Sequence, residues 1–224
     1  MQIAIVIPTL NEAAALPGTL EELRALPGDF EILVVDGGSN DGTLDLARRL
    51  GVRAVAGPRG RGAQMNHGAA LAGGDVLLFL HADTRLPRNA HALIEGAMRD
   101  PELQGGCFRL GFDRQHVLLR FFAFCTRFSF RTVHYGDAAY FVRADHFRAS
   151  GGYRAYPIME DLDFWLRMSR GGKVTVLDAS VVSSARRFSR CGIVRQQLRN
   201  IMLVLLFLIG VSPFTLHRFY QDVR

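Results

Sequence analysis

The amino-acid sequence predicts an α/β fold with a mainly parallel central sheet. Two observations carry this prediction. Short apolar runs rich in Val, Ile and Leu alternate with stretches of helical periodicity through the first half of the chain. Several of these runs end in polar or glycine-rich turns, such as the one that begins at Asp36. Because strands that alternate with helices are joined by right-handed crossovers, they are expected to lie parallel in one sheet.

Each element of the first half follows from this alternation. Strands are expected at residues 3–8, 31–35, 52–56 and 76–80, and helices at residues 11–26, 44–50, 63–72 and 88–98. Gly51 and the pair Gly73-Gly74 end the second and third helices, because glycine is common just past a helix C-terminus. Pro87 precedes the fourth helix, where a proline is well tolerated.

The second half of the chain is less regular. Strands are expected at residues 105–112, 138–142, 173–177 and 181–184. Helices are expected at residues 116–131, 161–170 and 193–210, with a further short helix that stops at Gly151-Gly152. No internal repeat and no low-complexity linker interrupts the sequence, so a single domain over residues 1–224 is expected.

The charge of the chain is uneven. Its 224 residues carry a formal net charge of +6, but residues 1–112 hold 10 basic and 13 acidic side chains, whereas residues 113–224 hold 17 basic and 8 acidic ones. Lys173 is the only lysine. The cysteines Cys107, Cys125 and Cys191 are few and far apart, which indicates no disulfide framework and favours a reducing compartment. The start of the chain does not resemble a signal peptide.

Several enzyme classes lack their motifs. The turn after the first strand contains no glycine, which argues against a dinucleotide site. Lys173 does not follow a P-loop pattern, and no serine-hydrolase elbow is present. No DNA- or RNA-binding motif accompanies the basic residues, so nucleic acid is not an expected partner.

Acidic side chains follow three of the expected strands. Glu12 follows the first strand, Asp36 ends the second, and Asp83 follows the fourth. Ligands bind beyond the carboxyl ends of strands in open parallel sheets, so these side chains are expected at one binding edge. A single polar residue at such a position can simply cap the following helix, as Asp41 or Ser39 could. Helix capping explains less well why acidic residues follow three strands.

The motifs taken together resemble family 2 glycosyltransferases with the GT-A fold. They are IVIPTLNE, VVDGGSNDGT, GRGAQMNHGA, FLHADT, GDAAYFVR and MEDLDFWLR, in this order over about residues 3–187. The sequences of the motifs GRGAQMN and FLHADT are most similar to those of a small bacterial subfamily linked to arsenosugar biosynthesis. The resemblance implies a GT-A-type three-layer sandwich with an additional C-terminal helix, and transfer of a sugar from a nucleotide-diphosphate sugar.

The resemblance also implies donor-binding residues. Pro8, Asn11, Glu12 and Asp36 match the nucleoside-binding positions; Arg61, Gln64 and Asn66 lie in a glycine-rich basic segment that suits a diphosphate; His81, Ala82 and Asp83 match the metal motif; Gly136, Asp137 and Arg186 match further sugar and diphosphate contacts. Simpler interpretations stay open for Glu12 as a helix N-terminal carboxylate, for the glycine-rich segment as a solvated loop, and for Arg186 as a surface charge.

A divalent metal, Mg²⁺ or Mn²⁺, is implied by the same resemblance. Similar enzymes hold it with two aspartates, whereas here His81 takes the place of the first and Asp83 matches the second. One carboxylate makes a weak site for a hard cation, so the diphosphate would supply most of the oxygen ligands. His81 is equally compatible with a structural role, a ribose contact and metal ligation, and Mn²⁺ accepts an imidazole more readily than Mg²⁺.

The acceptor hydroxyl requires a general base. In similar enzymes an acidic residue at a helix start has this role, and the matching pair is Glu160-Asp161. Asp161 is expected to be the base and Glu160 to orient it or the acceptor, while Asp163 is expected as a helix N-terminal residue. Two adjacent carboxylates raise the pKa of one of them, which favours a base near neutral pH. The resemblance implies inversion at the anomeric carbon; a merely charged first turn is the alternative for the pair.

The phenylalanine-rich segment 116–131 and the arginine-rich C-terminal region are the least enzyme-like parts. Residues 201–216 carry no charge, but 16 residues are short for a bilayer span and Pro213 interrupts them. Two interpretations stay open: a helical flap or homodimer surface, and a peripheral membrane contact beside the binding site of a lipid-linked acceptor.

The distribution of these motifs predicts that different parts of the chain have different functions. Residues 1–112 are expected to bind the nucleotide sugar, residues 113–190 to bind the acceptor, and residues 191–224 to form a helical tail. The protein is expected to be cytoplasmic. If the tail contacts the membrane, the protein is expected at the inner face of that membrane. A sugar nucleotidyltransferase and a non-catalytic membrane-associated binding module remain the alternative functions.

Overall fold

The structure is a computed structural model that describes residues 1–114, 116–125, 138–184 and 192–220. Its strands are β1 (Ile3–Thr9), β2 (Phe30–Asp36), β3 (Arg53–Ala56), β4 (Val76–Phe79), β5 (Thr84–Arg85), β6 (Leu103–Phe112), β7 (Tyr140–Arg143) and β8 (Lys173–Ser183). Its helices are α1 (Leu16–Arg24), α2 (Thr43–Arg49), α3 (Arg61–Leu71), α4 (Ala90–Met98), α5 (Val117–Cys125), α6 (Ala144–Ala149), α7 (Glu160–Gly171), α9 (Ile193–Leu208) and α10 (Pro213–His217).

The described strands form one eight-stranded sheet in the order β3-β2-β1-β4-β7-β6-β8-β5. The half formed by the first strands is parallel, because β1 pairs in parallel with β2 and β4, and β2 pairs in parallel with β3. The strand β7 then runs antiparallel between β4 and β6, and β6 pairs in parallel with β8. The predicted α/β class with a mainly parallel sheet is confirmed.

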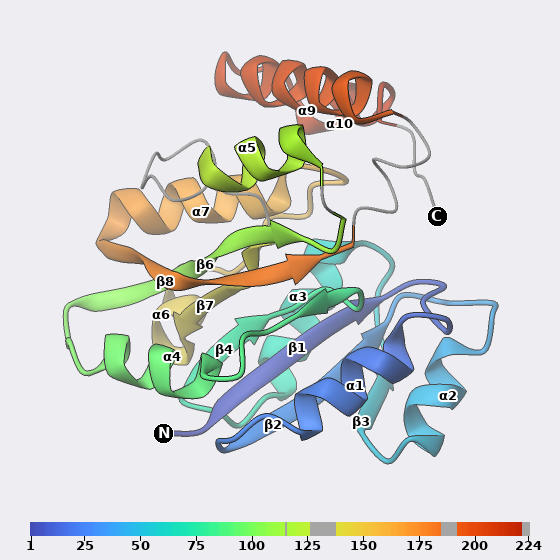
Figure 1. The fold of residues 1–224 in the computed structure, drawn as a ribbon, viewed down its shortest axis with the longest axis vertical. Helices are drawn as coiled ribbons and strands as arrows, with labels where there is room; N and C mark the ends of the chain where they lie inside the picture. Colours follow the sequence, from blue (N-terminus) through green and yellow to red (C-terminus); the bar gives the residue numbers. More distant parts are fainter. Residues whose placement is uncertain (115, 126–137, 185–191, 221–224) are drawn as a thin grey trace.

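Helices cover both faces of the sheet, as Figure 1 shows. Alternate residues of β1 point to opposite faces. Ile3, Ile5 and Ile7 belong to the core that includes buried residues of α1 and α4. Ala4 and Val6 belong to the second core, which includes buried residues of α3, α6 and α7. Because both faces of β1 are buried, the strand is an uninterrupted apolar run, as expected for a central parallel strand.

The helix predicted over residues 11–26 begins later, at Leu16. Asn11 has a φ of 56°, which is incompatible with a right-handed helix. The backbone N–H groups of Glu12 and Ala13 bind Thr43 Oγ1 and Asp41 Oδ2, at 3.0 and 3.1 Å. These contacts with the loop after β2 hold residues 11–13 outside the helix.

Two other boundaries differ from the predictions. Residues 173–183 form one strand, because the pairing of β8 with β6 continues past an irregularity between Phe108 and Arg109. The uncharged segment 201–216 is not one helix, because α9 ends at Leu208 and α10 starts at Pro213. Among the described residues no helix is both long and apolar enough to cross a membrane. The last six residues of the helix predicted over 116–131 lie outside the described ranges.

A further layer lies above one side of the sheet. Figure 1 shows α9 and α10 outermost, with α5 and α7 between them and the sheet. Val204 of α9 packs against Leu162 and Leu166 of α7, so α9 is anchored by its C-terminal half. This arrangement places the C-terminal helices over the segment that begins with Glu160.

Candidate active site

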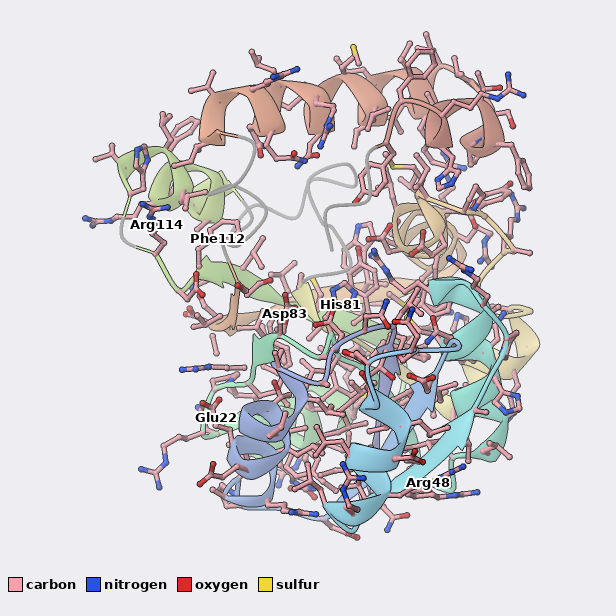
Figure 2. All side chains as sticks on the ribbon, turned by 90° about the vertical axis from the view of Figure 1, so that its right-hand side faces the viewer. Glu22, Arg48, His81, Asp83, Phe112 and Arg114 are labelled. Atoms are coloured by element: carbon pink, nitrogen blue, oxygen red, sulfur yellow. The ribbon has the colours of Figure 1, made fainter. Side chains whose placement is uncertain are left out.

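The predicted strand ends meet at one edge of the sheet. In the parallel pairing Thr9 lies beside Asp36, and Val6 lies beside Phe79, so β1, β2 and β4 point the same way. Figure 2 shows His81 and Asp83 beyond the end of β4, on the side of the sheet that faces α5 and α9. The acidic residues that follow the three strands therefore belong to one edge, as the sequence predicts.

Asp36 organises the loop that follows β2. Its buried carboxylate accepts hydrogen bonds from the backbone N–H groups of Gly38 and Ser39, at 3.0 and 2.8 Å, and from the hydroxyls of Ser39 and Thr9. Four donors match the roughly four lone-pair sites of a carboxylate. In the described structure Asp36 therefore holds its own loop, and its proposed contact with the nucleoside remains a prediction.

Asn11 joins the loops after β1 and β2. Its N–H donates to Ser39 Oγ at 2.8 Å, and its Oδ1 accepts from the N–H of Asn40 at 3.0 Å. Pro8 is part of β1, and Glu12 lies at the turn before α1. These residues shape the rim where the resemblance expects the nucleoside.

Gln64 and Asn66 tie the helix α3 to its surroundings. The buried Gln64 Nε2 donates to the carbonyls of Thr9 and Val35, at 2.7 and 2.8 Å. Asn66 donates to the carbonyl of Tyr153 and accepts from the N–H of Tyr153, at 2.8 and 2.9 Å. Both amides thus have backbone partners in the structure, whereas their predicted contacts with the diphosphate remain untested.

Glu160 and Asp161 open α7, next to a residue of unusual backbone conformation. Met159 has a φ of 65°, in the left-handed region that residues other than glycine rarely adopt. Such conformations cluster at active sites, where the surrounding structure holds them. The predicted acid pair is therefore presented from a backbone turn that local sequence preference disfavours.

Glu160 is buried and forms an ion pair with Arg61. The distance between Glu160 Oε1 and Arg61 Nε is 3.4 Å, and the Glu160 side chain is 4% exposed. The pKa of Glu160 is raised to about 7, mainly because the side chain is buried; the charges of Arg61 and His81 oppose the rise, and the neighbouring Asp161 adds to it. The structure thus brings together three predicted site residues that lie far apart in the sequence: Arg61, His81 and Glu160.

Asp161 is more accessible than Glu160. Its side chain is half-buried, and its Oδ1 accepts the N–H of Leu162 at 2.7 Å. Asp163, two residues further, is buried between Arg154 and Arg167, at 3.2 and 2.8 Å. Asp163 therefore stabilises the first turn of α7, as expected, and Asp161 is the more exposed carboxylate of this turn.

Arg167 and Tyr153 were not predicted from the sequence, but both make contacts that support this region. Arg167, the partner of Asp163, also donates to the carbonyls of Ser150 and Gly152, which joins α7 to the turn after α6. The spacing of Asp163 and Arg167 by four residues on a helix could have indicated their ion pair. No local pattern could have indicated the contact between Asn66 and Tyr153, which are 87 residues apart.

The described residues provide few metal ligands. No group of three or more His, Cys, Asp or Glu side chains within the described ranges could hold a metal ion. Asp83 and His81 at the end of β4 supply one carboxylate and one imidazole. Mg²⁺ is often held by one or two carboxylates together with substrate phosphates, so this donor set fits a cation that arrives with the diphosphate.

The remaining predicted residues divide into two groups. Ala82 is buried, and its carbonyl accepts a hydrogen bond from the Thr19 hydroxyl at 2.6 Å, which fastens the end of β4 to α1. Gly136, Asp137 and Arg186 lie outside the described residues, so the structure does not test their roles.

A family model for Glycosyl transferase family 2 matches residues 4–146, which is more than half of the chain. The chain belongs to this family. The family that the order of the motifs predicts is therefore confirmed.

Curated relatives match parts of this family 2 chain. A PGL/p-HBAD biosynthesis glycosyltransferase of Mycobacterium bovis is 47% identical over 91 residues, which cover 37% of the chain and 36% of that protein. An undecaprenyl-phosphate 4-deoxy-4-formamido-L-arabinose transferase of Aeromonas hydrophila is 33% identical over 118 residues, which cover 46% of the chain and 36% of that protein. The matches thus span about a third of each relative.

Solved structures show the same GT-A fold as this family 2 chain. The mannosyltransferase PcManGT of Pyrobaculum calidifontis, in complex with GDP-Man and Mn²⁺, has a TM-score of 0.73 at 18% identity, over 96% of this chain and 68% of that one. TarS 1–349 of S. aureus in complex with UDP-GlcNAc has a TM-score of 0.64 at 17% identity, over 83% and 59% of the two chains. The predicted GT-A architecture is confirmed.

The raised pKa of Glu160 leads to a prediction for the family 2 chain. Between about pH 4.5 and 7 the folded protein binds more protons at Glu160 than the unfolded chain, so this residue lowers the unfolding free energy as the pH rises. The variant Glu160→Gln is expected to remove this pH dependence. The total change in unfolding free energy that it removes is of the order of 3 kcal/mol. Urea denaturation at pH 5 and pH 8 measures it.

An exposed carboxylate provides the control for this experiment. Glu21 lies on the exposed side of α1, and Glu21→Gln is expected to leave the pH dependence of the unfolding free energy as in the wild type. If Glu160→Gln had the same slope as the wild type, Glu160 would not be the group with the raised pKa.

Proposed function

We propose that this chain transfers a sugar from a nucleotide-diphosphate sugar to an acceptor hydroxyl, with inversion and with Mg²⁺ or Mn²⁺. The observation that carries the proposal is the ion pair of Arg61 with Glu160, next to Asp161 and under the influence of His81. The ion pair joins the proposed diphosphate segment to Glu160, the residue before the proposed base Asp161. PcManGT with GDP-Man and Mn²⁺, and TarS with UDP-GlcNAc, support a donor of this class.

In the proposed mechanism Asp161 takes the proton from the acceptor hydroxyl. The acceptor oxygen forms a bond to the anomeric carbon as the bond from this carbon to the diphosphate oxygen breaks, and attack opposite the leaving group inverts the centre. Glu160, held by Arg61, positions Asp161 and the acceptor. The accessibility of Asp161 compared with Glu160 supports this division of roles.

The leaving diphosphate gains negative charge, which positive groups must stabilise. Asp83, with His81 beside it, would hold the divalent cation, which when bound neutralises the diphosphate. Arg61 and Arg186 are proposed to contact the diphosphate oxygens, because guanidinium groups form strong hydrogen bonds to phosphate. Pro8, Asn11, Glu12 and Asp36 are proposed to line the nucleoside site, with Gly136 and Asp137 near the sugar.

The acceptor is proposed to be lipid-linked. The relative from Aeromonas hydrophila is named for undecaprenyl-phosphate, which supports an acceptor of this class. Within this proposal residues 1–112 bind the donor, residues 113–190 bind the acceptor, and the protein acts at the inner face of the membrane. The link to arsenosugar biosynthesis stays a prediction from the sequences of the motifs GRGAQMN and FLHADT.

A panel of nucleotide-diphosphate sugars, each with and without Mn²⁺, tests the function. Sugar release or transfer from one donor, accelerated by Mn²⁺, is expected. The variant Asp83→Ala is expected to weaken Mn²⁺-dependent nucleotide binding at least about tenfold, because it removes the proposed carboxylate ligand. Isothermal titration calorimetry measures the binding, and Asp45→Ala, an exposed carboxylate of α2, is the control.

Three results would contradict the proposal. Tight donor binding without any release or transfer would indicate a non-catalytic binding module. Formation of a nucleoside triphosphate from the donor and pyrophosphate would indicate a nucleotidyltransferase. An unchanged Mn²⁺ titration of Asp83→Ala would remove Asp83 from the proposed site.

A further inference from the structure

The exposed apolar residues of the described chain gather on three helices. Apart from Met1, every large apolar side chain that is exposed among the described residues lies on α5, α9 or α10 or within two residues of the end of one of them. In Figure 1 α9 and α10 form the outermost layer of the molecule, with α5 directly beneath them. Contiguous apolar surface on one side of a protein marks a site of interaction.

The outer side of α9 is apolar over its whole length. Six of its exposed residues recur at the spacing of one helix face: Val194, Leu198, Ile201, Met202, Leu205 and Leu208. The inner side holds the buried polar residue Gln196, which is 1% exposed, as well as Leu203 and Val204. A helix on a water-facing surface normally has its polar face outward. The outer face of α9 is therefore built for a medium other than water.

The neighbouring helices continue this surface. On α5, Val117, Phe121 and Phe124 are exposed at the spacing of one helix face. Phe214 on α10 and Phe219 just after it are each 61% exposed. Both α5 and α10 contact α9. These side chains, together with the outer face of α9, are called the apolar face below.

The charges around the apolar face are mostly positive. The sequence from residue 179 to residue 221 contains six Arg and no Asp or Glu. Of these, Arg195 and Arg218 are exposed in the structure. The segment before and within α5 adds Arg114 and Arg120, against one exposed acid, Asp113. Anionic lipid headgroups attract such residues, at about 1 kcal/mol for each Arg near the surface.

A second copy of the chain fits this face less well. A two-fold dimer brings the same patch of both subunits together, so the arginines of one copy would approach those of the other. The anionic surface of a bilayer supplies the opposite charge to each arginine. The charge pattern therefore favours a membrane over a homodimer.

The dimensions of α9 indicate how it would bind. Its 16 residues span about 24 Å, less than the roughly 30 Å of a bilayer core. A helix with one apolar face and flanking Arg residues lies in the plane of the interface with its apolar face among the acyl chains. The helix would thus lie on the membrane without crossing it.

We propose that the apolar face docks this protein on an anionic lipid bilayer, with α9 in the plane of the interface. This docking places the acid pair close to the membrane, because Leu203 of α9 and Leu216 of α10 pack against Ile158, two residues before Glu160. The consequence for catalysis, delivery of a lipid-linked acceptor to Asp161, rests on the proposed function. The docking itself does not depend on it.

Flotation of the full chain with vesicles tests the docking. One set of vesicles contains phosphatidylcholine alone, and the other contains phosphatidylcholine mixed with phosphatidylglycerol. The wild type is expected to float with the anionic vesicles and to be partly released by high salt, because screening weakens the arginine contacts. Failure to float with anionic vesicles, or equal flotation with both sets at any salt concentration, would overturn the proposal.

A double variant tests the apolar face directly. Leu198 and Leu205 are 63% and 57% exposed, so Leu198→Glu with Leu205→Glu leaves the core intact. Flotation is expected to fall by at least about tenfold, because the variant loses two leucines that would enter the acyl chains on docking and adds two charges there. Ala70→Glu with Ala92→Glu adds the same charges at exposed positions on α3 and α4 and is expected to float like the wild type.

The outcomes separate docking from catalysis. Unchanged flotation of the Leu198/Leu205 variant would overturn the proposal. A second result would also overturn it. In that case light scattering would show a wild-type dimer that the Leu198/Leu205 variant converts to monomers, and neither protein would bind vesicles. Flotation is measured without donor, so a protein inactive on every donor but bound to anionic vesicles would contradict only the proposed function.

Discussion

The variant Asp161→Asn is expected to lower kcat for sugar transfer by about 10²- to 10⁴-fold, the usual contribution of a general base. The carboxamide has nearly the shape of the carboxylate, and its oxygen can still accept the N–H of Leu162. It does not accept a proton from the acceptor hydroxyl at neutral pH. The loss should therefore appear in turnover and leave the folded structure unchanged.

Donor binding and a neighbouring aspartate provide the controls for Asp161→Asn. Calorimetric titration with the nucleotide is expected to give the wild-type affinity, because the proposed base faces the acceptor. Asp163→Asn, two residues further on the same helix, weakens the ion pairs with Arg154 and Arg167 and is expected to lower the unfolding free energy instead. If Asp161→Asn retained the wild-type kcat, Asp161 would not be the base.

The variant Asp36→Ala is expected to lower the unfolding free energy by about 2–5 kcal/mol, since several donors lose their partner in a buried position. The N–H groups of Gly38 and Ser39 and the hydroxyls of Thr9 and Ser39 all donate to this carboxylate. The loop after β2 would lose its attachment to β1, so nucleotide binding should weaken as well. Urea denaturation and calorimetry measure the two effects.

Asp41 is the matched control for Asp36. It lies in the same loop and accepts hydrogen bonds from Thr43 and Ala13, but it is exposed. Water can replace it as a partner for these donors, so Asp41→Ala is expected to cost less than about 2 kcal/mol. Equal losses for the two variants would show that the burial of Asp36 is not what makes it important.

The strand ends show how far the sequence predicts this protein. Alternation of apolar runs and helical patterns correctly predicts β1, β2, β3 and β4, their parallel arrangement and the edge that carries Asp36 and Asp83. The start of α7 at Glu160 is predicted to within one residue. These features depend on patterns within about ten residues, which the sequence displays directly.

The environments of the site residues could not be predicted in the same way. Gln64 and Asn66 lie in a motif that suits an anion, but in the structure they bind the carbonyls of Thr9, Val35 and Tyr153. The adjacent carboxylates indicate that one pKa rises, but not which one. Burial of Glu160 against α3 decides this, because desolvation is the largest contribution to its raised pKa.

The sequence by itself determined the family, the order of the main elements and the residues that approach the sheet edge. The tertiary structure decided which carboxylate is buried, which polar side chains hold loops, and that the apolar stripe of α9 faces outward. The physical reason is the range of the interactions. Periodicity and turn preference act between near neighbours in the sequence, whereas burial, desolvation and ion pairs arise between segments such as Arg61 and Glu160 that only folding brings together.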